Sequence, residues 1–160
     1  MSTPRSALEW AIPVGSAVAV VALAVAFWGE LPNPLAVRWN ADGLPQTAGD
    51  RTRELLIGSI VVPATALLPL LLADRPREVG AQRTLVVTGH VLGTLGLGHR
   101  WRIVAANREV THWQDAVSAL PPTAVVAVGV LAGATGWWLS GHRRSHGDDQ
   151  SGPPGRPDPG

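Results

Sequence analysis

The stretch LPNPLAVRWNADGLP, from Leu31 to Pro45, is the densest cluster of turn-forming residues in the chain. Pro32 and Pro34 favour an extended backbone, because proline fixes its own φ and restricts the residue before it. The residues that follow, 35–39, favour one short strand. The segment 40–43 then ends in Gly43 and is typical of a tight turn in which glycine takes a positive φ.

This stretch lies within a polar loop, residues 29–53, which we call the motif loop. Four apolar blocks surround it, and they cover residues 11–28, 55–73, 84–106 and 121–139. A helix of about 20 residues crosses the hydrocarbon core of a bilayer. The sequence therefore predicts an all-α membrane protein, a bundle of four transmembrane helices with a short β-like loop between the first two.

The third block is the most polar of the four. Residues 84–98 alone are too short to cross, and the block spans only if it continues past His99 to residue 106. Arg100 and Arg102 would then extend their charged groups to the membrane interface. Because of its polarity, we expect this helix to face protein more than lipid. The polar connector at 107–120 is interpreted as a short interfacial helix.

The ends of the chain have distinct characters. The first block is interpreted as a retained helix and not as a cleaved signal peptide, because it is long and does not end in small residues. The domain is expected to cover residues 1–140. The tail at 141–160 is almost free of apolar side chains and is predicted to be disordered.

The distribution of arginine favours one orientation. All 13 basic residues are arginine, a usage typical of a GC-rich bacterial genome. A tight cluster after the second block and the pair Arg143–Arg144 after the fourth favour a cytoplasmic location for both termini. The prediction is a multi-pass protein of the bacterial inner membrane, with the motif loop outside the cytoplasm.

Composition argues against several functional classes. The chain has no cysteine and a net charge of +1, so it lacks thiol chemistry and the basic surface of a nucleic-acid-binding protein. His99 and His112 lie far apart in the sequence. His142 and His146 have helical spacing, but they lie in the predicted disordered tail. We expect no enzyme activity, no metal and no cofactor.

Two glycine pairs mark helix packing. Gly89 and Gly93 lie one turn apart in the third block, and Gly129 and Gly133 have the same spacing in the fourth. They indicate either a dimer interface or close packing of the third and fourth helices within one chain. The second interpretation is favoured because both helices are already present. The sequence does not determine the oligomeric state.

His90 is the one ionisable side chain near the middle of a block. Such a residue is a functional candidate, for example in a proton relay. The alternative is a neutral histidine that is hydrogen-bonded to a neighbouring helix. The alternative is favoured because no aspartate or glutamate lies inside any of the four blocks.

The motif loop resembles the signature of a bacterial membrane domain of unknown function that occurs at the N-terminus of SdpI-type immunity proteins. In that family, Leu-Pro leads to His-Trp/Phe-Asn and then to Gly-x-Pro-Asp, directly after the first membrane helix. The positions that match this signature are Leu31, Pro32, Trp39, Asn40, Gly43 and Pro45. Arg51 stands where the family often has a basic residue.

Two positions depart from this pattern. Arg38 stands where the family usually has histidine, and Gln46 stands where aspartate usually follows the proline. Metal binding or proton transfer by those two family residues is therefore not expected here. The positions that match have the character of structural residues.

Two functional hypotheses remain. The first is a non-enzymatic accessory, signalling or immunity-type protein, whose outer loop recognises a protein or peptide with Arg38 and Trp39 as a cation–aromatic pair. The second is a small transporter or channel subunit, with Pro63, Pro69 and His90 along a path through the bilayer. The absence of carboxylates from the blocks favours the first.

Overall fold

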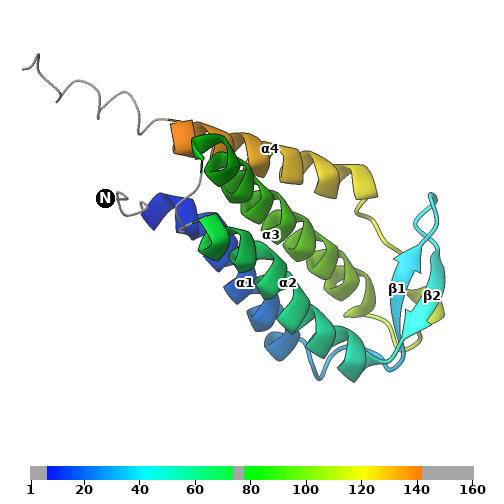
Figure 1. Ribbon diagram of the computed structural model, residues 1–160. Coiled ribbons are helices and arrows are strands. Elements are labelled where there is room, and N and C mark those ends of the chain that lie inside the picture. The colour runs from blue at the N-terminus through cyan, green and yellow to red at the C-terminus, as the bar shows by residue number, and fades with distance from the viewer. Residues whose placement is uncertain (1–6, 74–77, 142–160) are drawn as a thin grey trace, which may run out of the picture.

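The computed structural model describes residues 7–73 and 78–141. This part of the chain contains four α-helices and a two-stranded antiparallel sheet (Figure 1). In chain order the elements are α1 (Ala7–Ala26), β1 (Leu35–Trp39), β2 (Pro45–Gly49), α2 (Arg51–Ala73), α3 (Val79–Asn107), the 3-10 helix η1 (Trp113–Asp115) and α4 (Pro122–Gly141). The prediction of a disordered tail concerns residues that, from 142 onward, lie outside the described ranges.

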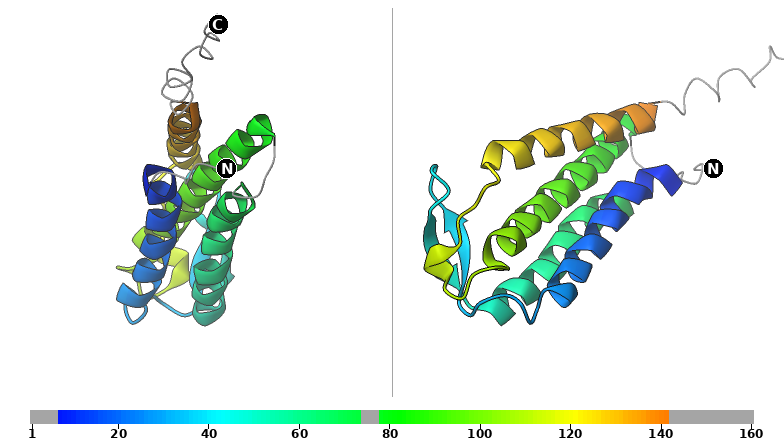
Figure 2. Two further views of the ribbon diagram at one scale, coloured as in Figure 1. Left: turned by 60° about the vertical axis from the view of Figure 1, so that its left-hand side comes forward. Right: turned by 180° about the vertical axis from the view of Figure 1, so that it is seen from behind.

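The helices run alternately in opposite directions, and the sheet lies at one end of them (Figures 1 and 2). The start of α1 and the end of α4 lie together at the opposite end. Helix α3 is central, because it packs against α1, α2 and α4. Helices α1 and α2 also pack against each other, whereas α4 packs mainly against α3. The arrangement is therefore a mutually packed trio with α4 laid against α3.

Among the residues that the structure describes, three helices are long and apolar enough to cross a membrane. The qualifying segments are Glu9–Ala26, Arg51–Ala73 and Pro122–Ser140. Helix α3 does not qualify, although its 29 residues extend over about 43 Å. The expectation that this helix faces protein is confirmed by its central position among the other three.

The glycines of α3 allow close approach to α1 and α2. A Cβ atom on Gly89 would lie 2.8 Å from the backbone oxygen of Ala66 in α2. One on Gly93 would lie 3.1 Å from the Cβ of Ala66 and 3.4 Å from that of Ser16 in α1. Both residues of this pair therefore serve the trio, and their contacts are not with α4.

The glycines of α4 face α3 instead. A Cβ on Gly129 would lie 2.6 Å from the side chain of Leu95, and one on Gly133 would lie 2.8 Å from that of Val91. These contacts join the third and fourth helices of one chain, which is the interpretation that the sequence favoured. Only this glycine pair takes part in them.

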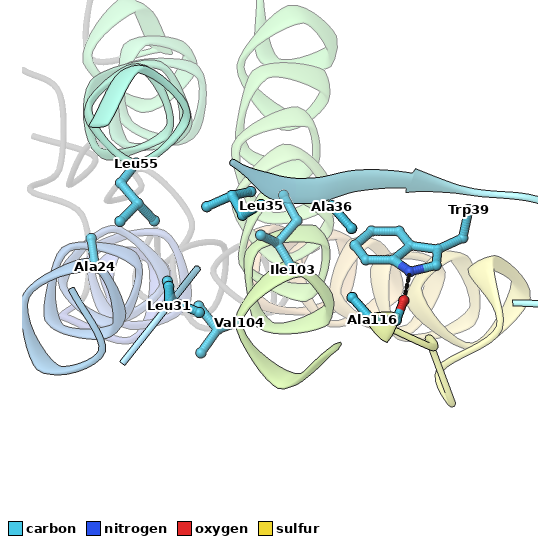
Figure 3. Close-up of a cluster of buried hydrophobic side chains, with 9 residues drawn as sticks. All are labelled: Ala24, Leu31, Leu35, Ala36, Trp39, Leu55, Ile103, Val104 and Ala116. Carbon is cyan, nitrogen blue, oxygen red and sulfur yellow. Dashed lines mark hydrogen bonds between the residues drawn. The ribbon is translucent and has the colours of Figure 1, made fainter. Parts of the chain in front are cut away.

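A cluster of buried apolar side chains lies at the sheet end of the molecule, where the trio of helices meets the sheet (Figure 3). Its members come from α1, the motif loop, α2, α3 and the connector that follows α3. They are Ala24, Leu31, Leu35, Ala36, Trp39, Leu55, Ile103, Val104 and Ala116. This core joins the helices to the motif loop in one folded unit.

The predicted strand at 35–39 is confirmed, and it has a partner that the sequence did not indicate. Residues 45–49 form β2, although Pro, Ala and Gly are poor strand formers. The pairing matches Leu35 with Gly49 and Trp39 with Pro45, and its register shifts on both sides of Arg38. Closure of the turn before β2 places these residues beside β1.

The predicted interfacial helix at 107–120 is wrong. Helix α3 continues to Asn107, and the described connector contains only the short η1. The connector backbone is bonded to the motif loop instead, since the N–H of Ser118 donates a 2.9 Å hydrogen bond to the carbonyl of Gly43. A polar segment with partners of this kind does not need a helix to satisfy its backbone groups.

The first helix begins earlier than the apolar block. It starts at Ala7, and it contains Glu9, which is almost fully buried. Glu9 thus lies inside the helix, although it precedes the apolar block at 11–28, which contains no acidic residue. The run Ala-Leu-Glu consists of strong helix formers, so the helix extends into the turn before the apolar residues.

Candidate functional site

The motif loop and the connector after α3 form one unit at the sheet end. We call it the cap and define it as residues 31–49 and 108–120. Trp39 joins its two parts: the side chain is only 9% exposed, and its Nε1 donates a 2.5 Å hydrogen bond to the carbonyl of Ala116 (Figure 3). Trp39 is therefore a core residue of the cap and not an exposed recognition residue.

Asn107 fixes the cap to the end of α3. Its side chain is fully buried, and Oδ1 accepts a 2.8 Å hydrogen bond from the N–H of Ala36. Its Nδ2 donates to the carbonyls of Ala36 at 2.9 Å and Ile103 at 2.8 Å. The side-chain amide thus pairs with β1 as a neighbouring strand would. It satisfies backbone groups that would otherwise be buried without partners.

The turn between the strands is closed by Asn40 and Gly43. The N–H of Leu44 donates a 2.8 Å hydrogen bond to Oδ1 of Asn40, and Gly43 has a φ of 79°. A Cβ atom on Gly43 would lie 2.6 Å from the backbone oxygen of Ser118. Both the backbone conformation and the packing of the connector therefore require glycine at this position.

Arg51 closes the base of the motif loop. Its Nη1 donates a 2.6 Å hydrogen bond to the carbonyl of Leu31, and its backbone N–H donates to Oδ1 of Asn33 at 3.1 Å. Its guanidinium also lies 6.0 Å from the ring centroid of Trp28. The loop residues that precede β1, including the half-buried Pro32, are thereby held at the start of α2. Arg51 has a structural role in this arrangement.

The cation beside Trp39 is Arg102 of α3. Its guanidinium carbon lies 4.9 Å from the centroid of the Trp39 ring, and its Nε donates a 2.6 Å hydrogen bond to the hydroxyl of Ser118. Arg38 instead is exposed, although it is the next residue to Trp39. The expected pair of Arg38 and Trp39 is therefore wrong, because adjacent strand residues face opposite sides.

Arg38 is left free by this arrangement. Within the described ranges, its guanidinium makes no hydrogen bond, ion pair or ring contact. The register shifts around it keep the residues on both sides, Val37 and Trp39, packed against the core. Arg38 is thus exposed on β1, and the residues on both sides of it attach this strand to the core.

His90 lies between α3 and α4, and its side chain is fully buried. Its Nδ1 is 2.9 Å from the carbonyl oxygen of Val86, so this nitrogen carries the proton. The bond is within the same helix, which corrects the expectation of a bond to a neighbouring helix. Its Nε2 is buried and has no hydrogen-bond partner among the described residues. Gly136 of α4 leaves room for the ring, since a Cβ there would lie 3.0 Å from Cγ of His90.

Arg100 lies between α3 and α2, with only 9% of the residue exposed. Its guanidinium occupies the space that a side chain at Gly58 of α2 would need. Its Nε and Nη1 are buried, and neither has a hydrogen-bond partner in the part of the chain that the structure describes. The expectation that Arg100 extends to the membrane interface is therefore wrong, because the glycine of α2 opens an internal position for it.

Other predicted residues have no comparable contacts. Pro45 begins β2, Pro69 is buried in α2, and Pro63 is half-buried on the same helix. Among the residues that the structure describes, no three histidine or acidic side chains come together as metal ligands. His142 and His146 lie outside the described residues.

Sequence reasoning missed four important residues. Asn107 and Arg102 organise the cap, and Glu9 and Arg100 are buried among the helices. The signal available was that polar residues stand at helix ends, where a side chain can reach backbone groups of the adjoining loop. That signal does not indicate which loop would fold back onto the helix.

Comparison with known proteins adds no further identification. No family model matches the chain, and no curated protein or solved structure matches it. The resemblance of residues 31–45 to the domain of SdpI-type immunity proteins therefore stays a prediction.

Proposed function

We propose that this chain is a multi-pass protein of the bacterial inner membrane that recognises a partner through its cap. All four helices cross the bilayer in this proposal, and α3 crosses inside the protein. Both termini are cytoplasmic and the cap lies on the outer surface. The protein is non-enzymatic and of an accessory, signalling or immunity type, in keeping with its resemblance to the SdpI-associated domain.

The outer faces of the helices support the membrane location. Large apolar side chains are exposed along α1, α2 and α4, including Val18, Ile60 and Leu131. In water, a continuous apolar surface of this kind would be unfavourable. In a bilayer it would face lipid, and polar α3 would be shielded by the three apolar helices.

One observation carries the recognition proposal: Arg38 points outward from a rigid strand and has no partner within the described ranges. A strand held by Asn107 and Trp39 loses little conformational freedom when Arg38 binds. Arginine on such a support is suited to a carboxylate, which it can bind with two parallel hydrogen bonds.

The tip of the cap adds apolar surface beside this charge. Leu44 is 53% exposed and Val117 is 56% exposed. They are neighbours, because the residues next to them, Gly43 and Ser118, share a backbone hydrogen bond. An acidic peptide or protein segment with an apolar side chain fits this combination of groups.

Crosslinking in intact cells tests this proposal. A photoreactive amino acid at Leu44 should crosslink a partner, and Arg38→Gln should reduce the product about tenfold, as expected for the loss of a charge-assisted hydrogen bond. Arg53→Gln is the matched control, since Arg53 is also exposed near the cap. Equal crosslinking by wild type and Arg38→Gln, at equal membrane expression, would contradict the proposal.

The orientation is tested separately. The chain contains no cysteine, so single cysteines at Ala41 and Val79 can be labelled without background. Ala41 lies in the cap, and Val79 lies at the opposite end of the helices. An impermeant thiol reagent should label Ala41 and spare Val79 in intact cells. The reverse pattern would place the cap in the cytoplasm.

A small transporter or channel subunit is the second candidate. It is favoured by buried His90, whose Nε2 has no hydrogen-bond partner within residues 7–73 and 78–141, and by the presence of buried Glu9 in α1. This function predicts that purified protein in liposomes moves protons or another solute, and that His90→Leu changes the rate. Liposomes that remain impermeable across the pH range would argue against it.

A further inference from the structure

Helix α4 diverges from α3 toward the cap (Figures 1 and 2). An apolar groove lies between these two helices. The groove has a volume of about 280 Å³. Its lining from α3 includes Leu97, Gly98 and Trp101, and its lining from α4 includes Val125 and Val128. The groove is partly open and lies between two helices, so in a protein that crosses the bilayer an occupant would enter from the surrounding lipid.

A smaller pocket of about 70 Å³ continues from this groove beneath the connector. Leu120 lines both pockets, and the smaller one also contains Arg102 and Ser118. On α3, Gly98, Trp101 and Arg102 have the spacing of one helix face. The apolar groove and the charged pocket are therefore successive parts of one surface.

Arg102 is held in place at the polar end of this surface. Its Nε is bonded to Ser118 and its guanidinium lies over Trp39. The two terminal nitrogens have no hydrogen-bond partner within the described residues. A fixed guanidinium with free terminal N–H groups is suited to bind phosphate oxygens.

Trp101 marks the level of the membrane interface on the same surface. It is 44% exposed, lines the groove and directly precedes Arg102 in the sequence. Exposed tryptophan in membrane proteins prefers the headgroup region. The order of groups along α3 is thus apolar groove, interfacial tryptophan and arginine, which is also the order of acyl chain, interface and phosphate in a phospholipid.

We propose that this surface binds one anionic phospholipid, with an acyl chain in the groove and its phosphate at Arg102. The lipid comes from the leaflet on the side of the cap. The inference rests on the membrane location proposed above, but it does not depend on partner recognition by Arg38.

Native mass spectrometry of the full chain in detergent tests this site. The protein is titrated with dioleoyl phosphatidylglycerol or with dioleoyl phosphatidylcholine. Wild type should bind the anionic lipid about tenfold more tightly, and Arg102→Gln should bring the two affinities to within about twofold. Arg53→Gln is the matched charge control and should keep the wild-type preference.

Because Arg102 also stabilises the cap, a second variant tests the groove without changing Arg102. Ala124→Phe fills the groove from α4 and should weaken binding of both lipids about tenfold. Val130→Phe adds the same side chain to an exposed position of α4 outside the groove lining and should leave binding unchanged.

Three results would overturn the inference. Equal affinity of wild type for the two lipids would indicate non-selective lipid contact. Unchanged binding of phosphatidylglycerol by Ala124→Phe would place the lipid elsewhere. A dimer that dissociates in Ala124→Phe and binds no lipid would show that a second copy of the chain fills the groove. The lipid-binding measurements do not use the crosslinker at Leu44. A negative result for lipid binding would therefore leave the proposal of partner recognition by Arg38 untouched, and the crosslinking experiment tests that proposal separately.

Discussion

The cap and the helices below it are held together by different kinds of contact. In the cap, the side chains of Asn107, Trp39 and Asn40 form specific hydrogen bonds to backbone groups of the motif loop and the connector. Among the helices, glycines such as Gly93 allow backbones to approach. Two polar atoms of Arg100 are buried there without hydrogen-bond partners among the described residues. One region is stabilised by directed bonds and the other by close packing.

This difference shows where each region can tolerate change. A directed hydrogen bond to a buried backbone group cannot be replaced by an apolar side chain, because the partner group is left unsatisfied. A packing contact between helices depends on volume and tolerates a change of residue that preserves the fit. Substitutions in the cap should therefore have larger effects than substitutions of similar size among the helices.

The largest effect is expected from Asn107→Ala. The substitution removes three hydrogen bonds and leaves both backbone groups of Ala36 without these partners, at a cost of about 3 kcal/mol. Thermal unfolding in detergent, followed by tryptophan fluorescence, measures the loss. Gln114→Ala, an exposed substitution in the connector, should leave the midpoint unchanged. Equal midpoints for the two variants would show that Asn107 does not hold the cap.

Gly43→Ala should have the next largest effect. Alanine at a φ of 79° and against the backbone oxygen of Ser118 should cost about 2 kcal/mol. Because the turn closes the cap, limited proteolysis should cut the variant within residues 40–45 faster than wild type. Gly29→Ala is the control in the same loop, since no atom lies within 4 Å of a Cβ there. A turn that resists proteolysis in Gly43→Ala would contradict this role.

Gly58→Ala should have a smaller effect. The added methyl group displaces the guanidinium of Arg100, and the gain in helix propensity offsets part of that cost, which leaves a net loss of about 1 kcal/mol. Gly15→Ala meets no neighbouring atom within 4 Å and should instead raise the unfolding midpoint slightly. The double variant Gly58→Ala/Arg100→Ala should recover much of the loss. If the two glycine variants are equally stable, Arg100 does not occupy this space.

The helices could be located from the sequence because apolar length is a local property. Blocks at 55–73 and 121–139 predicted α2 and α4 to within a few residues. The strand at 35–39 and the turn that ends at Gly43 were also predicted, since proline and glycine restrict the backbone wherever they stand. The prediction of a helix in the connector was wrong because the hydrogen-bond partners of its backbone come from a distant part of the chain.

The candidate site was only partly predictable for the same reason. Arg38 was identified as a departure from a motif, and it is exposed on β1 of the cap. Its supposed partner Trp39 is separated in sequence from its true neighbours, Arg102 and Ala116. No local pattern indicates that a tryptophan of the motif loop will face the end of α3.

The sequence by itself determined the number of long helices, their approximate bounds and the extended course of the motif loop, because hydropathy and the restrictions of proline and glycine act within a few residues. The tertiary structure decided which polar residues are buried. Asn107 pairs with β1, Arg102 covers Trp39 and Arg100 fills the space at Gly58. Each of these contacts joins two segments that meet only after folding. Burial makes such contacts important for stability, because a polar group without a partner is costly away from water.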